Sequence, residues 1–275
     1  MKVLILRGGT QPRRVRDGKA GAATPSTRER GVMALGSGSG HWVLVNMSSA
    51  VAHQLDSDGG LDSHPGLSDA DVRAVVLTDA QVDHVGGLLS LRGGAPIDLY
   101  ATPAVFEQLT TALPVLPVLQ HYNDVHWHVV PVAGDRRVAS FRVEGLPSLE
   151  FTAVATRSTP PPHLARGEGP GVGDSIALAV RDLATGQRVF CAPGLSQIGA
   201  TEFEWMREAD CLLLDHPQPA AQDPASAELQ IWRDLLRRLP ARHKVLFDDA
   251  RDAATRAEWA DQGIELAYDG MEIEL

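Results

Sequence analysis

Short runs of apolar residues alternate with polar, glycine-containing segments along the whole chain. Such runs predict buried strands at 3–6, 32–35, 42–45, 74–77, 97–100, 151–156, 176–180, 187–191, 211–214, 244–247 and 264–268. Apolar residues at helical spacing predict helices at 47–55, 103–109, 227–239 and 253–259. The glycines of 36–41 fit a hairpin turn between the second and third strands. The mixture predicts an α/β fold.

One segment, residues 75–89 with the sequence VVLTDAQVDHVGGLL, organises the rest of the chain. It begins in the buried strand at 74–77, and Gly86-Gly87 precede an apolar run that predicts a helix just beyond them. The polar residues expected on the loop between them are Thr78, Asp79, Gln81, Asp83 and His84. Ligands usually bind at the carboxyl ends of strands in open α/β folds.

Two interpretations of this loop are open. The adjacent pair Asp83-His84, with Asp79 four residues earlier, can present oxygen and imidazole donors to one divalent metal. Alternatively, Asp79 caps a turn and Asp83 caps the following helix.

Composition limits the classes of function. The chain has 275 residues, 44% of them apolar, and no linker divides it, so we expect one domain over residues 1–275. A net charge of −10 argues against a nucleic-acid partner. Cys191 and Cys211 lie in apolar runs and indicate a reducing compartment without disulfides. There is no secretory signal pattern and no run near the roughly 20 apolar residues that cross a bilayer, so we expect a cytoplasmic protein without membrane contact.

The loop motif resembles the metallo-β-lactamase superfamily signature His-x-His-x-Asp-His followed by Gly-Gly, with Asp79 and Gln81 in place of the first two histidines. Its form TDAQVDHVGGLLSLR is similar to the coenzyme PQQ biosynthesis protein B (PqqB) family, which shares that loss. The similarity continues through PIDLYATPAVFEQLTTALPVLPVLQHYN, GDSIAL, RVFCAPGL, ADCLLLDH and GIELAYDGMEIEL. It implies a single-domain metallo-β-lactamase αββα sandwich.

The same resemblance implies a metal site. Asp83 and His84 would hold the ion from one loop and Asp248 from another, where the family typically has a histidine that completes its iron site. His216, a departure from the family, is either a further ligand or a loop residue. This donor set implies iron(II), with manganese or zinc as alternatives. Asp79, Gln81 and Asp215 are then expected to orient ligands or carry protons in catalysis.

Three residues beyond the strand at 151–156 are candidates for substrate binding: Arg157, His163 and Arg166. A guanidinium matches a carboxylate through two parallel hydrogen bonds, and His163 lies on a loop able to fold back over the site. An equal alternative is that the arginines pair with surface acids. The strand ends in Thr156 where the wider superfamily has a metal-binding histidine, and Pro193 follows Ala192 where hydrolytic relatives have a bridging aspartate, so a two-metal hydrolytic centre is poorly supported.

Two further regions carry candidate chemistry. Residues 8–30 correspond to a family region with a zinc-binding cysteine cluster, but no cysteine precedes Cys191, so we expect no structural zinc site there. His126 and His128 fall on one side of a predicted strand, either as a metal-binding pair or as surface residues. The resemblance assigns them no metal role.

The function that the resemblance implies is an iron-dependent oxygenase that hydroxylates a tyrosine-derived ring in the biosynthesis of a peptide-derived quinone cofactor. Its partner would be a small tyrosine-containing peptide or amino-acid-derived precursor, and a homodimer is open. A second hypothesis is a catalytically altered homologue that binds a pathway precursor or partner. A metal-dependent hydrolase ranks last, because the residues that position its attacking hydroxide are missing.

Overall fold

The computed structural model describes residues 1–8, 29–38, 40–56, 71–90, 96–158, 160–164, 171–215, 227–247 and 253–275. Three residues that the sequence predicts in the site, Arg166, His216 and Asp248, lie outside these ranges, as does most of the segment 8–30.

Seven strands form the first sheet, in the order β14-β1-β2-β3-β4-β5-β6. Their bounds are β1 Lys2–Arg7, β2 Val32–Gly36, β3 His41–Val45, β4 Asp71–Val76, β5 Ile97–Ala101, β6 Val125–Val129 and β14 Met271–Glu274. The predicted hairpin is confirmed, because β2 and β3 pair antiparallel with Gly36 opposite Trp42. Strands β3 to β6 run parallel, so their carboxyl ends meet at one edge of the sandwich.

The second sheet also has seven strands, in the order β13-β12-β11-β10-β9-β8-β7. Their bounds are β7 Val138–Phe141, β8 Leu149–Ala155, β9 Ile176–Asp182, β10 Arg188–Ala192, β11 Cys211–Asp215, β12 His243–Phe247 and β13 Glu265–Leu266. The hairpin predicted from the runs at 176–180 and 187–191 is present as β9 and β10.

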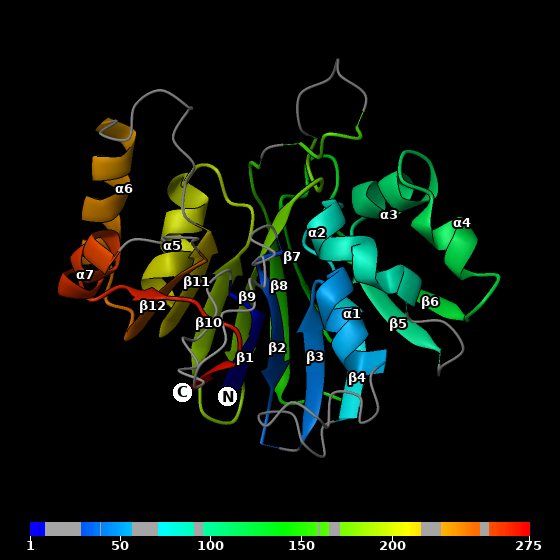
Figure 1. Cartoon of the computed structure of the whole chain (residues 1–275), viewed down its shortest axis with the longest axis horizontal. Coiled ribbons are helices and arrows are strands. Elements are labelled where there is room, and N and C mark those ends of the chain that lie inside the picture. The colour runs from blue at the N-terminus through cyan, green and yellow to red at the C-terminus, as the bar shows by residue number, and fades with distance from the viewer. Residues whose placement is uncertain are drawn as a thin grey trace, which may run out of the picture.

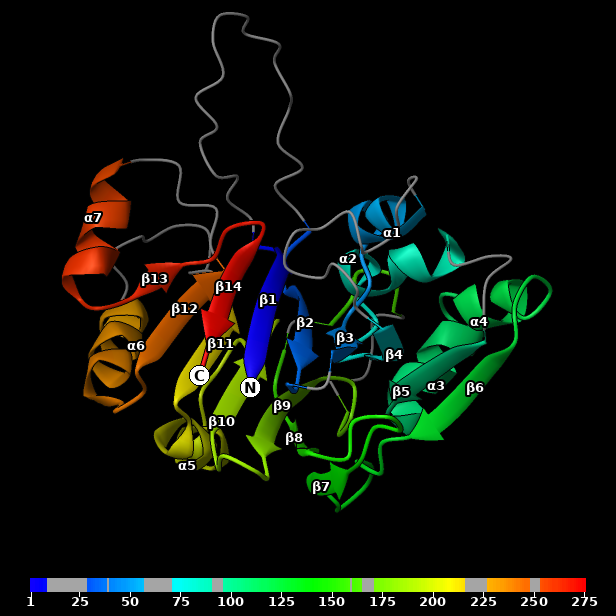
Figure 2. The same ribbon diagram turned by 90° about the horizontal axis from the view of Figure 1, so that it is seen from below.

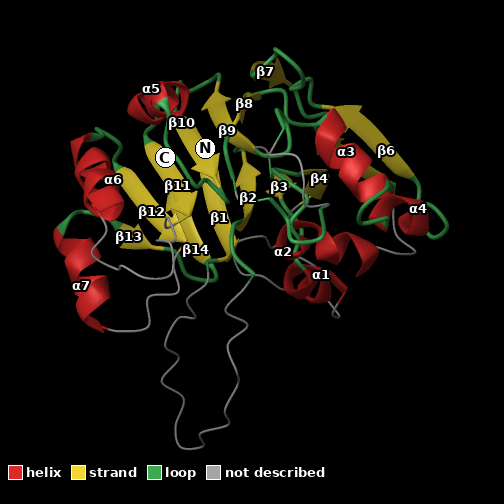
Figure 3. Ribbon diagram, turned by 90° about the horizontal axis from the view of Figure 1, so that it is seen from above, coloured by secondary structure: helices red, strands yellow, loops and turns green. Residues whose placement is uncertain are grey.

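Helices cover the outer face of each sheet, which gives the predicted αββα order of layers (Figures 1 and 3). Over the first sheet lie α1 Ser49–Asp56, α2 Val82–Val85, a 3₁₀ helix Gly86–Ser90, α3 Pro103–Thr110 and α4 Val115–Leu119. Over the second lie α5 Ala200–Glu208, α6 Ala227–Arg238 and α7 Ala253–Asp261. The helix predicted at 103–109 is confirmed as α3: Pro103 is its first residue, and Thr102 caps it by accepting the Val105 N–H at 3.1 Å.

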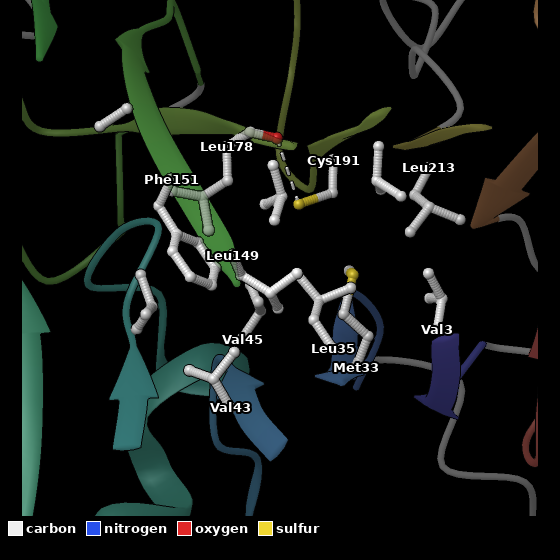
Figure 4. Close-up of a cluster of buried hydrophobic side chains, with 14 of the residues drawn as sticks. Val3, Met33, Leu35, Val43, Val45, Leu149, Phe151, Leu178, Cys191 and Leu213 are labelled. Atoms are coloured by element: carbon white, nitrogen blue, oxygen red, sulfur yellow. Dashed lines mark hydrogen bonds between the residues drawn. The ribbon is translucent and has the colours of Figure 1, made fainter. Parts of the chain in front are cut away.

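The central strands are continuously apolar because both of their faces are buried. In β1, Val3 and Ile5 belong to the core between the sheets, whereas Leu4 and Leu6 pack under the helices of the first sheet. Figure 4 shows the core between the sheets, with Val3, Met33, Leu35, Val43 and Val45 of one sheet facing Leu149, Phe151, Leu178, Cys191 and Leu213 of the other. The run 113–119, for which pocket lining and core packing were both open, packs as core through α4.

The strand predicted at 264–268 was wrong in extent: it is only Glu265–Leu266, and a further strand, β14, follows it. In β14, Met271 and Ile273 are buried while Glu272 and Glu274 are exposed, the alternation of a strand with one covered face. It pairs antiparallel with β1, which places both termini side by side (Figure 2). Among the described residues, no helix has the length and apolar character required to cross a bilayer.

Both cysteines are buried, and this predicts their reactivity. Burial raises the pKa of the Cys191 thiol to about 12, and it raises the pKa of Cys211 well above its usual range. The thiols therefore stay protonated at pH 8, and the protonated form is not the nucleophile. We expect no alkylation by iodoacetamide in the native protein and two alkylated sites after unfolding in guanidinium, as read by mass spectrometry. Rapid labelling of the folded protein would contradict this burial.

Candidate functional site

Polar side chains of both sheets meet at the carboxyl edge of the sandwich. Thr78 and Asp79 follow β4 of the first sheet, and Asp215 ends β11 of the second. The two sheets are joined here directly, because the Ile176 N–H of β9 donates to the Thr78 carbonyl at 2.9 Å. The apolar core between the sheets thus ends in a buried polar cluster.

His84 is held by Asp79 at the centre of this cluster. Its Nδ1 lies 2.7 Å from Asp79 Oδ1, and both side chains are buried. Asp79 is itself fixed, because Oδ1 accepts the Gln81 N–H at 2.9 Å and Oδ2 accepts the Thr78 hydroxyl at 3.3 Å. A carboxylate on one ring nitrogen sets the tautomer and leaves the other, Nε2, as the nitrogen able to bind a metal.

The elements around His84 differ from the sequence prediction. The helix expected beyond Gly86-Gly87 begins earlier, as α2 Val82–Val85, so Asp83 and His84 lie in a helical turn and not on a loop. Helix α2 has only four residues, about one turn, so its apolar residues cannot repeat along one face. The sequence therefore offers no periodicity by which to recognise it. The interpretation of Asp83 as its cap was wrong, since the N-cap is Gln81. The alternative role of Asp79 in a turn is confirmed by its bond to the Gln81 N–H.

Asn46 is a structural residue of the site that sequence reasoning missed. It is fully buried with φ of 64°, and its Oδ1 accepts the Thr78 N–H at 3.0 Å and the Thr78 hydroxyl at 3.1 Å. Its Nδ2 donates to the Gly31 carbonyl at 3.1 Å. An asparagine that ends a buried apolar strand was the available signal, because Asn tolerates left-handed backbone better than most residues.

Gly31, held by Asn46, lies against the free nitrogen of His84. Its φ is +71°, and a Cβ built there would lie 3.3 Å from His84 Nε2 and 2.6 Å from Pro193 Cβ. A side chain at position 31 would therefore fill the space beside Nε2. The missing Cβ leaves that space for another group.

Asp215 contributes a carboxylate from the opposite sheet. Its Oδ2 accepts the Gly194 N–H at 2.7 Å, whereas its buried Oδ1 has no hydrogen-bond partner within the described ranges. Burial raises the pKa of Asp215, and the positive charge of Arg30 opposes the rise. A buried carboxylate oxygen without a donor favours either a proton or a cation beside it.

The electrostatics around His84 favour positive charge. Burial by itself lowers the pKa of His84, but the carboxylate of Asp79, followed by those of Asp215 and Asp83, more than offsets it, so the pKa is raised. Three carboxylates that stabilise an imidazolium also stabilise a metal cation in its place.

The donors present fit a metal ion in part. The imidazole Nε2 of His84 and the unpaired Oδ1 of Asp215 are donors that iron(II), manganese and zinc accept. In the part of the chain that the structure describes, however, no group of three or more His, Cys, Asp or Glu side chains is placed to hold an ion. A complete set therefore requires residues outside those ranges, where Asp248 and His216 lie.

Among the described residues, Arg157 and His163 make no hydrogen bond to this cluster. Arg157 is exposed just beyond β8, and its carbonyl accepts both the N–H and the hydroxyl of Ser196, at 3.1 and 2.8 Å. His163 is half-buried; burial lowers its pKa, and its Nε2 has no hydrogen-bond partner among the described residues.

The histidine pair of β6 is engaged elsewhere. His128 Nε2 lies 2.8 Å and His126 Nδ1 3.4 Å from one oxygen of Asp98 on β5. These partly exposed ion pairs favour the surface interpretation of the pair.

The amino-acid sequence of this chain is similar to those of known proteins. The beta-lactamase superfamily domain profile matches residues 41–247. The chain is 33% identical to coenzyme PQQ synthesis protein B of Pseudomonas putida (strain GB-1), over 93% of this chain and 90% of that protein. It is 35% identical to the protein of the same name from Pseudomonas aeruginosa (strain UCBPP-PA14), over 96% and 92%.

Solved structures share the fold. The crystal structure of Zn²⁺-bound PqqB from Methylobacterium extorquens superposes with a TM-score of 0.73 at 20% identity, over the whole of both chains. A diphosphatase from the PhnP family superposes with a TM-score of 0.63 at 20% identity, over 100% of this chain and 97% of that one. At such identities the likeness shows a common fold alone.

Proposed function

Because this chain belongs to the coenzyme PQQ synthesis protein B family of the β-lactamase superfamily, we propose that it is a metal-dependent oxygenase of quinone-cofactor biosynthesis. Its reaction would hydroxylate a tyrosine-derived ring in a small peptide or amino-acid-derived precursor, with iron(II) as the metal. The single observation that carries this proposal is the buried Asp79–His84 pair, which leaves one imidazole nitrogen available under the influence of Asp215, whose Oδ1 has no partner among the described residues.

The ligand set proposed here combines two segments of the chain. His84 would bind through Nε2, with Asp83 from the same helical turn and Asp248 from the segment after β12. His216 remains a possible addition to this set. Bound iron(II) would supply the activation of dioxygen. Zinc, present in the Methylobacterium extorquens protein, and manganese are the alternatives for the same donors.

The chain's own residues would then prepare the site. Asp79 holds the His84 ring in one orientation, and Asn46 and Gly31 keep space beside its Nε2. Asp215, whose pKa is raised by burial, can hold a proton at Oδ1 and release it within the closed cluster. Gln81 would act through its backbone, whose N–H fixes the Asp79 carboxylate.

This arrangement favours an oxygenase over a hydrolase. In place of the first two histidines of the superfamily signature stand Asp79, which bonds His84, and Gln81, which begins α2. Asp79 thereby orients a single imidazole and would not position a second metal ion. In two-metal hydrolysis, two ions together stabilise the attacking and the leaving oxygen, so both ions must be held.

The test is a hydroxylation assay on protein purified without chelator. We would measure its metal content, then incubate it with iron(II), dioxygen, ascorbate and a tyrosine-containing peptide. In the balanced reaction, one atom of dioxygen is inserted into a ring C–H bond to give C–OH. The other atom is reduced to water by two electrons and two protons from ascorbate. We expect a mass gain of one oxygen atom that carries ¹⁸O from ¹⁸O₂. A protein that binds the peptide but neither metal nor oxygen would overturn the proposal and favour the binding homologue.

A further inference from the structure

A cavity of about 320 Å³ lies at the end of β8 in the second sheet. It is lined by Arg137 and Arg157, by Ala155 at the end of β8 and by residues 197–202. The two arginines come from neighbouring chain segments, since the Ala155 N–H donates to the Arg137 carbonyl at 2.7 Å. Two positively charged side chains thus line one hollow.

Neither guanidinium has a partner among the described residues: the side chains of Arg137 and Arg157 make no ion pair and no hydrogen bond there. The carboxylate that also lines the hollow, Glu202, is turned to the backbone, because its Oε2 accepts the Gly199 N–H at 3.0 Å at the start of α5. The two arginines therefore outnumber the one carboxylate among the described residues of the hollow.

One loop connects this hollow to the candidate metal site. At its start, the Gly194 N–H donates to Asp215 at 2.7 Å. Two residues later, Ser196 donates twice to the carbonyl of Arg157, and Gln197 to Gly199 then line the hollow. This loop therefore runs from Asp215 to the hollow, so a substrate that reached both would lie along it.

We infer that the hollow of Arg137 and Arg157 binds carboxylate groups of the substrate. This inference rests on the proposed function, because an amino-acid-derived precursor carries carboxylates apart from its aromatic ring. A guanidinium forms two parallel hydrogen bonds with a carboxylate, and two guanidiniums without partners among the described residues match a dicarboxylate. The bound anion would also relieve the repulsion between the two positive charges.

The test measures binding of glutarate by calorimetry at low ionic strength. The protein is freed of metal with 1,10-phenanthroline, a neutral chelator that does not itself compete for an anion site. We expect glutarate to bind and its neutral diamide not to bind. Arg137→Gln and Arg157→Gln should each raise the dissociation constant about tenfold. The matched control is Arg181→Gln, an exposed arginine of β9 that also has no partner among the described residues and lies away from this hollow.

Each outcome decides the inference. Equal binding by wild type and both variants, or an equal loss in Arg181→Gln, would overturn it, as would tighter Arg157-dependent binding of inorganic phosphate than of glutarate. Unchanged melting temperatures exclude misfolding as the cause of a loss. The inference and the proposed function fail separately: glutarate binding without any hydroxylation leaves the subsite intact, whereas hydroxylation with arginine-independent glutarate binding removes only the subsite.

Discussion

Replacing His84 by alanine should abolish metal binding and, with it, hydroxylation. His84 provides the imidazole of the buried cluster at the carboxyl edge, and the described residues around it offer carboxylates only. Loss of a metal ligand costs more than loss of a supporting residue, so we expect iron(II) affinity to fall by at least about 100-fold. Metal content after dialysis and titration with iron(II) under argon measure the effect.

Two further variants separate the loss of a metal ligand from the loss of a residue that only orients the ligand. His126→Ala removes an exposed histidine on β6 and should leave metal content unchanged. Asp79→Ala keeps the ligand but frees its ring, so metal affinity should fall by about 10- to 100-fold and less than in His84→Ala. If the His84→Ala protein kept the metal content of the wild type, the ion would bind elsewhere. The proposed reaction would then lack its metal site.

Gly87→Ala should be among the most destabilising single substitutions near the site. A Cβ at position 87 would overlap the backbone carbonyl of Ser48 and lie 2.8 Å from the Met47 side chain, and backbone cannot move aside cheaply. The Gly87 N–H also donates to the Met47 carbonyl at 3.0 Å, so displacement breaks a bond. We expect the free energy of unfolding to fall by about 3 kcal/mol, measured by urea denaturation.

The neighbouring glycine is the matched control. A Cβ at Gly86 would lie 3.1 Å from the hydroxyl of Ser49, a side chain that can rotate, and at an ordinary contact distance of 3.7 Å from Val82 Cγ1. Gly86 has φ of −60°, which alanine adopts readily. Gly86→Ala should therefore change stability by less than about 1 kcal/mol. Equal effects of the two substitutions would mean that the contact between α1 and the 3₁₀ helix is not as close as the structure places it.

The sequence predicted most elements because apolar periodicity and cap chemistry are local properties. The strands from β1 to β5 and helix α3 were recognisable in this way. Where local signals were weak, the prediction was wrong or missing: α2 is too short to show a period, and β14 was not predicted. The predicted ligands Asp248 and His216 and the predicted substrate residue Arg166 stay predictions, because they lie outside the described residues.

The sequence alone is enough to recognise the family, the layered fold and the residue types of the motif around His84. These are recognised from patterns of residues that are neighbours along the chain. Only the tertiary structure decided that Asp79 bonds His84, that Asn46 fixes Gly31 beside it, and that Asp215 arrives from the other sheet with one oxygen that has no partner among the described residues. The bonds of Asn46 and the approach of Asp215 form because segments that are distant in sequence meet at one edge of a closed sandwich. The Asp79–His84 bond spans only five residues, but it needs the turn into α2 that no local pattern predicted.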